Sequence, residues 1–455
     1  MSKMSNKDKH GEVFTPPSLV SEMYEKLLEY SHFHVDRKSL KIFEPGAGKG
    51  AFFDKFKDLT SGVHASYIMN EINDEHFDIL ETKMKKYDED KTKLIKGDVL
   101  QMNKQSFENC GYDMVVGNLP FNSKGKKFVP SLASKKSEGF IKSAEKGEYG
   151  KSQSITIWTK ITHYCFENIL NEGGYYYCII PCIWLKPDNA GIYELFTQKY
   201  TLHYLKIYDC HTANKLFGYN CQTPICYVLV QKTPRLFEIG PNLTMFDIYD
   251  HDKNSWGKFR LIDGYCIPTS QFPIFLKHVN YFTKHYMGGT TMGDMVKKIS
   301  CMRKDILDHT INNYKGPVFL EDADEKEGYK IITGSIFDKT KKCLRLTGFT
   351  CGNPGLYHGI KKIILPHKRL AKFVKDKDGN YGLSGRDMFV FLCDDKTDDE
   401  LDTLYEFLNL EHIQNMITSG FRIRMNFIEK YVFSYIPWIL CDEFNMNDYL
   451  TYINS

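Results

Sequence analysis

A short stretch around residue 118 constrains this chain more than any other. Residues 115–122 read V-V-G-N-L-P-F-N, so apolar residues lead into an amide, a proline and an aromatic ring. The pattern predicts a buried strand that ends in a tight turn, in which Pro120 stiffens the backbone and has no N–H to donate. The side-chain carbonyl of Asn118 and the backbone carbonyl of Leu119 then offer two acceptors beside the flat face of Phe121.

Two acceptors next to an aromatic face suit a planar ring that carries an exocyclic NH2 group. Such an amine is a poor nucleophile, because its lone pair is delocalised into the ring. Accepting both of its hydrogen bonds favours the pyramidal, nucleophilic form, and holding a reactive carbon in line completes the arrangement. A strand-end turn with a core phenylalanine would use the same residues, so the stretch alone leaves both interpretations open.

A second informative stretch, residues 41–53, reads K-I-F-E-P-G-A-G-K-G-A-F-F. It predicts a short strand, a turn with three alternate glycines, and a helix. Glycines let the backbone approach a ligand closely, and the helix start presents free N–H groups. The stretch matches neither the G-x-G-x-x-G fingerprint nor a P-loop. Because Glu44 would repel a phosphate and attract a cation, the turn predicts a ligand with an ammonium or sulfonium group.

Three further predicted strands end in polar side chains, at Glu71, Asp98 and Asn118. If these strands run parallel to the strand at 41–45, their ends fall along the edge where open α/β sheets bind ligands. A carboxylate at the end of the second strand is where such sheets hold ribose hydroxyls. Each acid alone is more often a surface cap, but their order and spacing together favour a ligand site.

A chain of 455 residues is longer than a domain with a single hydrophobic core usually is, so we expect two domains. Strands and helices alternate to about residue 235 and predict a mostly parallel sheet of about seven strands. Helices are expected at 18–30, capped by Ser18, and at 74–87 and 154–170. Turns and short strands then dominate to about residue 392, before a helix at 394–409 and a strand at 421–424.

Charge and cysteine content bound the setting of the protein. The net charge of +3 does not exclude a nucleic-acid partner, because nucleic-acid binding depends on how charge is distributed over the protein and not on its total. The 13 cysteines form no C-x-x-C pair, and with a polar N-terminus they predict reduced thiols in a cytoplasm-like compartment. No apolar run reaches the length of a membrane span, so no membrane partner is expected.

Two segments are rich in basic residues. Residues 123–151 mix lysines with glycine and serine, which fits a surface loop or a basic flap over a polyanion equally well. Residues 339–375 carry many lysines and arginines without any Asp or Glu, which favours phosphate contact. The candidate phosphate ligands are Lys341, Lys342, Arg345, Lys361, Lys362, Lys368 and Arg369.

Together these stretches resemble the N6-adenine DNA methyltransferases of restriction–modification systems, in the class whose cofactor domain comes first. The resemblance rests on G-E-V-F-T-P at 11–16, E-P-G-A-G-K-G at 44–50 and N-L-P-F at 118–121, in that order. It implies a Rossmann-like, doubly wound, seven-stranded methyltransferase sheet in residues 1–235. A mixed α+β target-recognition domain would follow in residues 236–455, where the resemblance is architectural only.

The resemblance also implies S-adenosylmethionine as the cofactor. The residues implied to hold it are Phe14, Thr15 and Pro16 in the leading loop, Glu44, Gly46 and Gly48 around the methionine part, Glu71 at the ribose and Asp98 at the adenine amine. The residues implied to handle the target base are Asn118, Leu119, Pro120 and Phe121, with Phe217 stacking from the other side. The family more often has proline where Leu119 stands, but a backbone carbonyl serves equally well.

The implied reaction is methylation of the N6 amine of an adenine that is rotated out of duplex DNA. It needs no metal and no nucleophilic residue. The implied partners are double-stranded DNA and a cognate restriction endonuclease, and the setting is bacterial cytoplasm or the host cell of a phage or virus. RNA adenine, protein glutamine and cytosine-N4 methylation remain alternatives, as does a catalytically silent DNA-binding subunit.

Overall fold

The computed structural model divides into two compact units. The first comprises Met1–Tyr249 with Asn254–Gly264, and the second Asp250–Lys253 with Tyr265–Ser455. The structure describes residues 13–30, 33, 38–62, 64–87, 90–102, 111–121, 156–218, 224–235, 243–286, 288–299, 318–320, 328–338, 343–366, 372–384, 388–422 and 428–455. The basic segment 123–151 and residues Lys341, Lys342, Lys368 and Arg369 lie outside the described residues.

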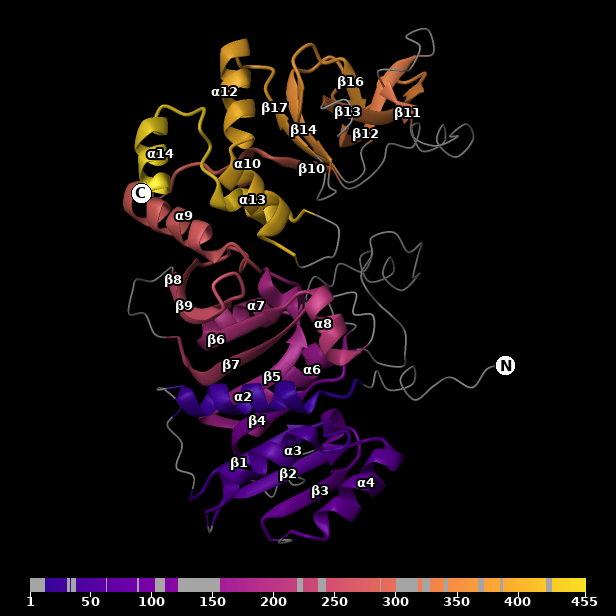
Figure 1. The fold of residues 1–455 in the computed structure, drawn as a ribbon, viewed down its shortest axis with the longest axis vertical. Coiled ribbons are helices and arrows are strands. Elements are labelled where there is room, and N and C mark those ends of the chain that lie inside the picture. Colours follow the sequence, from indigo (N-terminus) through magenta and orange to yellow (C-terminus); the bar gives the residue numbers. More distant parts are fainter. Residues whose placement is uncertain are drawn as a thin grey trace, which may run out of the picture. The chain divides into compact units, whose positions relative to one another are not determined.

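The first unit is built on one sheet with the strand order β3-β2-β1-β4-β5-β7-β6-β8-β9 (Figure 1). The strands from β3 to β5 run parallel to their neighbours, and β7 is antiparallel to both β5 and β6. From β1 the chain proceeds outward to β3 and then returns to build β4 and β5 on the other side. This doubly wound order confirms the predicted α/β class, and it makes the β1–β4 junction the point where the winding reverses.

The elements of the first unit follow the expected alternation. Its strands are β1 (Lys41–Pro45), β2 (Ser66–Glu71), β3 (Thr92–Lys96), β4 (Tyr112–Asn118), β5 (Leu170–Pro181), β6 (Tyr200–Tyr208), β7 (Ile225–Pro234), β8 (Leu243–Asp250) and β9 (Ser255–Ile262). Its helices are α2 (Pro17–Glu29), α3 (Ala51–Phe56), α4 (Asp74–Met84), α6 (Ile157–Tyr164), α7 (Ile192–Glu194) and α8 (Cys210–Phe217).

The sheet has two strands more than the seven expected from the sequence. Strand β8 pairs in parallel with β6, through Tyr204 with Asp247 and Leu205 with Ile248. Strand β9 contacts α2, where the ammonium of Lys26 lies 4.0 Å from the ring centroid of Trp256. Because β8 and β9 continue the sheet, the first compact unit extends to Gly264 and not only to residue 235.

Helix α2 begins one residue earlier than predicted. Pro17 occupies its first turn, where the missing N–H costs nothing, and Ser18 is therefore inside the helix and not its cap. The sequence pattern predicts an apolar face of Leu19, Met23, Leu27 and Leu28, and the first three are buried, whereas Leu28 is 41% exposed. This places the loop in front of α2 against the sheet, and that loop contributes to the candidate site.

The second unit mixes helices with two small sheets, in the orders β10-β17-β14-β15 and β11-β13-β12-β16 (Figure 1). Its strands are β10 (Lys297–Ile299), β11 (Val318–Phe319), β12 (Tyr329–Asp338), β13 (Cys343–Cys351), β14 (Lys362–Pro366), β15 (Val374–Asp376), β16 (Tyr381–Leu383) and β17 (Met388–Leu392). Its helices are α9 (Phe272–His285), α10 (Met292–Met295), α12 (Asp398–Leu408), α13 (Glu411–Ser419) and α14 (Met446–Asn454).

Two predictions for the second unit differ from the structure. Helix α9 was not predicted, although Phe275, Val279 and Phe282 recur at helical spacing and are buried. Residues 421–422 are not part of a strand, and the rest of the strand predicted at 421–424 lies outside the described residues. Among the residues that the structure describes, no helix combines the length and apolar character that crossing a membrane requires.

Candidate active site

The glycine-rich bend after β1 has a backbone that only glycine adopts readily. Gly46, Gly48 and Gly50 have φ angles of 69°, 57° and 79°, all in the left-handed region. The neighbouring strand β2 holds the bend, because Ala47 N–H donates to the Asn70 carbonyl at 2.9 Å. The three glycines are therefore required by the shape of the bend.

Glu71 ties the bend to the end of β2. Its Oε2 accepts the N–H of Gly48 at 2.6 Å, and its Oε1 accepts those of Ile72 and Asn73, each at 2.8 Å. A carboxylate offers about four acceptor positions, so these three bonds leave Oε2 with one position for a further donor. The buried side chain thus serves the protein backbone first and can accept one ligand hydroxyl in addition.

Glu44, which precedes the bend, is 1% exposed. The Tyr67 hydroxyl donates to its Oε2 at 2.7 Å. Burial raises the pKa of Glu44 from 4.5 to about 8, while the hydrogen bond from Tyr67 opposes this rise and the nearby Glu71 adds to it. The carboxyl therefore holds its proton near neutral pH, and a cation bound next to it would favour the ionised form.

Glu44 predicts a measurable pH dependence of stability. A folded-state pKa above the unfolded value of 4.5 gives a contribution that is complete below about pH 4.5 and lost as the pH rises through about 8. Relative to Glu44→Gln, the free energy of unfolding of the wild type should fall by up to about 5 kcal/mol across this window. Urea titrations at several pH values measure the difference, and parallel pH profiles for the two proteins would contradict the assignment.

Asn118 at the end of β4 makes two hydrogen bonds with the loop before α2. Its Nδ2 donates to the Val13 carbonyl at 3.2 Å and to Thr15 Oγ1 at 3.1 Å. Its Oδ1 is shielded from solvent, and no donor among the described residues reaches it. A buried acceptor without a donor is costly, so this atom is positioned for a ligand that brings an N–H group.

The Asn118 corner and the glycine-rich bend lie against each other. A methyl group built on Gly46 would be 3.7 Å from Cδ of Pro120, and one built on Gly117 would be 3.7 Å from Cγ of Glu44. Leu119 is buried, and its N–H donates to the Ile179 carbonyl of β5 at 3.4 Å. The parallel strands β1 and β4 thus bring the two motifs together at one edge of the sheet.

The remaining candidate residues lie around this edge. The ring of Phe14 is 50% exposed and meets the Lys49 ammonium at 4.5 Å and the His76 ring edge-on at 5.4 Å. Asp98 accepts the N–H of Leu100 at 3.0 Å, which gives one of its oxygens a capping role. Both aromatic candidates for the target base, Phe121 and Phe217, are partly buried and pack against the hydrophobic core of the first unit.

Three positions that the sequence analysis did not select also shape the site. Val13 contributes its backbone carbonyl, for which a sequence carries no signal. Tyr67 orients Glu44 from within β2 and resembles any other core tyrosine in the sequence. Ile72 contributes its backbone N–H to Glu71 Oε1, and a backbone donor also leaves no signal in the sequence.

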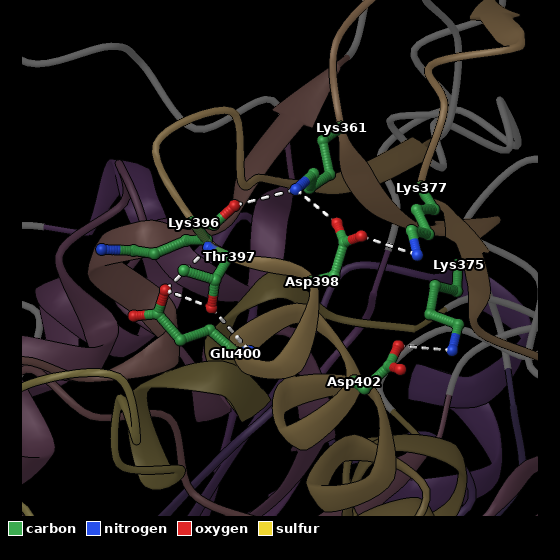
Figure 2. A network of polar contacts seen from close by, with 8 residues as sticks. All are labelled: Lys361, Lys375, Lys377, Lys396, Thr397, Asp398, Glu400 and Asp402. Atoms are coloured by element: carbon green, nitrogen blue, oxygen red, sulfur yellow. Dashed lines mark hydrogen bonds and ion pairs between the residues drawn. The ribbon is translucent and has the colours of Figure 1, made fainter.

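Three lysines of the second unit pair with acidic residues of α12. Figure 2 shows Asp398 between Lys361 and Lys377, at 2.7 and 2.6 Å, and Asp402 paired with Lys375 at 2.6 Å. Hydrogen bonds from both lysines lower the pKa of Asp398. The segment free of acids in the sequence therefore acquires acidic partners in the fold, and Lys361 is already engaged in this network.

Lys362 cannot contact DNA in this structure, which corrects the prediction from the sequence. Its side chain is 0% exposed, and its ammonium pairs with Asp376 at 2.5 Å and donates to the Ile360 carbonyl at 3.0 Å. Burial lowers the pKa of Lys362, and the bond to Asp376 partly restores it. Arg345 remains a candidate, with its guanidinium 3.4 Å from the Phe319 ring centroid.

Several solved structures resemble this fold at low identity. One is the methyltransferase subunit of a type I restriction-modification system from Streptococcus thermophilus, at 14% identity and a TM-score of 0.37 over 53% of this chain and 49% of that one. The type I restriction enzyme EcoKI M protein gives 14% identity and a TM-score of 0.34 over 54% and 49%. The chain thus spans about half the length of these two proteins.

A third similar structure is the type IIG restriction endonuclease BpuSI, at 12% identity and a TM-score of 0.43 over 98% of this chain and 61% of that one. Among curated proteins, none matches the chain. The family described as N-6 DNA Methylase matches residues 1–149, which contain the bend, Glu71 and the Asn118 corner. The resemblance predicted from the motifs is thus confirmed: over this part the chain is similar to the N-6 DNA methylases.

Proposed function

We propose that this protein is a site-specific DNA methyltransferase that transfers a methyl group from S-adenosylmethionine to the N6 amine of an adenine rotated out of a duplex. The observation that carries the proposal is the buried Oδ1 of Asn118, which accepts no hydrogen bond from the described residues. An adenine amine brings N–H donors, and a buried acceptor favours such a donor strongly.

The residues at the bend fit the proposed methyl donor. Its backbone is open at Gly48, where a methyl group built on the glycine would meet nothing within 4 Å. Glu71 can accept a ribose hydroxyl through Oε2, and Glu44 is a buried carboxyl next to the bend that a cation would favour in its ionised form. When bound, the donor supplies a methyl group that its sulfonium makes labile.

The chain's own residues would bind and orient the acceptor base. Asn118 Oδ1 and the Leu119 carbonyl are proposed to accept the two amine hydrogens and to direct the nitrogen lone pair towards the bend. Phe121, and Phe217 from α8, are proposed to stack on the base. Stacking would offset part of the cost of unstacking the base, which is on the order of a few kcal/mol.

The second unit is proposed to recognise the DNA target, and duplex DNA is the proposed partner. Among the described basic residues of segment 339–375, the exposed Lys372 is proposed to meet phosphate, since Lys361 and Lys375 pair with α12 and Lys362 is buried. Arg345, whose guanidinium lies over the Phe319 ring, is kept as a candidate from the sequence. A cognate restriction endonuclease remains a prediction from the resemblance.

A methyl-transfer assay tests the proposal. The protein is incubated with radiolabelled S-adenosylmethionine and duplex DNA, RNA or a protein mixture, and the labelled product is hydrolysed and identified. We expect label in N6-methyladenine of duplex DNA. Label in RNA, in glutamine or in N4-methylcytosine would replace the proposed acceptor by the corresponding alternative. Donor binding by calorimetry without any transfer would indicate a catalytically silent DNA-binding subunit.

A further inference from the structure

The loop before α2 contacts the candidate catalytic amide with two acceptor atoms. Val13 O and Thr15 Oγ1 receive both N–H groups of Asn118, at 3.2 and 3.1 Å. A backbone carbonyl can only accept, so the amide must turn its NH2 group to the loop and its Oδ1 away from it. If the amide were rotated by half a turn, Oδ1 would face the Val13 carbonyl and the two oxygens would repel each other.

The residue between these two contacts reaches the other half of the site. Phe14 carries the Lys49 ammonium over its ring at 4.5 Å and meets His76 edge-on. Lys49 belongs to the glycine-rich bend, and His76 to the first turns of α4, which follows Glu71. Successive residues of one short segment therefore contact the proposed donor site and the proposed acceptor site.

We propose that Thr15 is a positioning residue, whose hydroxyl together with the Val13 carbonyl holds the Asn118 amide with Oδ1 directed to the acceptor amine. This inference rests on the proposed methyl transfer for its role in the reaction. Thr15 is 8% exposed, so water cannot easily replace its hydroxyl as the acceptor for Nδ2. Loss of the Thr15 hydroxyl removes one of the two hydrogen bonds that hold the Asn118 amide and leaves the rest of the site in place.

A trio of variants of the full chain tests the proposal. Thr15→Val keeps the shape and removes the hydroxyl, and Thr15→Ser keeps the hydroxyl. Thr60→Val is the matched control, since Thr60 is also buried in the first unit but donates to the Lys57 carbonyl. We expect Thr15→Val to lower kcat between about tenfold and about 100-fold, since a misoriented catalytic group costs rates of this size.

The other parameters separate positioning from general damage. In this structure the Thr15 hydroxyl contacts Asn118, so the positioning role replaces the donor contact that the family resemblance implies for Thr15. The Kd for S-adenosylmethionine by calorimetry and the KM for duplex DNA should therefore change by less than about threefold in Thr15→Val. Thr15→Ser should restore kcat to within about threefold of the wild type, and Thr60→Val should leave it unchanged. Unchanged kcat in Thr15→Val, no rescue by serine, or an equal loss in Thr60→Val would each overturn the proposal.

A spectroscopic readout keeps the inference separate from the proposed function. With ¹⁵N-asparagine labelling, the side-chain NH2 protons of Asn118, assigned through the loss of their signals in Asn118→Ala, should exchange slowly with solvent in the wild type and faster in Thr15→Val. If the wild type transfers no methyl group to any acceptor, the proposed function fails while this difference still supports the amide orientation. Equal exchange in both proteins would overturn the inference even if the wild type is active.

Discussion

Replacing Asn118 by alanine is expected to lower kcat for methyl transfer by about 10³-fold, because the buried acceptor proposed to bind the reacting amine is lost. The adjacent bend is held by Asn70 and Glu71 and does not depend on the Asn118 side chain. The Kd for S-adenosylmethionine should therefore change far less than kcat. A fall in kcat with little change in binding is the signature of an interaction made mainly in the transition state.

Single-turnover methylation of duplex DNA and calorimetric titration of the donor measure the two quantities. Asn171→Ala is a suitable control, since Asn171 also donates through Nδ2, to Asp113 at 3.0 Å, but lies on the exposed part of β5. The control should retain the wild-type kcat. If Asn118→Ala keeps kcat within about tenfold of the wild type, Asn118 does not have the role proposed for it.

Much of the architecture around the site could be predicted from the sequence. Glu71 and Asn118 were expected at the ends of parallel strands, and β2, β1 and β4 are neighbours in the sheet with the predicted direction. The prediction succeeded because strand periodicity, the glycine pattern and the polar strand ends all indicate one edge of one sheet.

Other parts of the fold depend on information that no local pattern carries. The alternation of buried and less buried residues in β8 is typical of a strand. Its pairing with β6, however, joins residues far apart in the sequence, which a local pattern does not predict. That pairing decides where the first unit ends. In the same way, the pKa of Glu44 is raised by burial and lowered by the hydrogen bond from Tyr67, which is distant in the sequence.

The basic segment shows why sequence composition misleads about charge. Lys361 and Lys362 are adjacent in the sequence and resemble one another, yet Lys361 reaches Asp398 at the molecular surface and Lys362 lies inside the second unit against Asp376. Lys361 precedes β14, whereas Lys362 is the first residue of that strand, in which every residue is buried. The acidic partners follow the segment in the chain and were therefore not counted with it.

Lys362→Met is expected to destabilise the protein without a direct effect on DNA binding. The change leaves Asp376 buried without its cation, although the N–H groups of Asn380 and Tyr381 still donate to it, at 2.8 and 3.1 Å. Removing one partner of a buried ion pair typically lowers the free energy of unfolding by about 3–5 kcal/mol. We expect a loss near the lower end of this range, since those two backbone hydrogen bonds remain.

Urea unfolding and the salt dependence of DNA affinity together show whether Lys362 stabilises the fold through Asp376 or binds DNA phosphate. Lys372→Met, an exposed change on the same segment, is the control and should alter stability by less than about 0.5 kcal/mol. Adding Asp376→Asn to Lys362→Met should recover part of the loss, because the unpaired buried charge is gone.

A lysine that binds DNA phosphate would behave in the opposite way. Its loss would leave the unfolding midpoint unchanged and reduce the slope of log K against log salt by about 0.9. That result for Lys362→Met would return this residue to the DNA-binding surface.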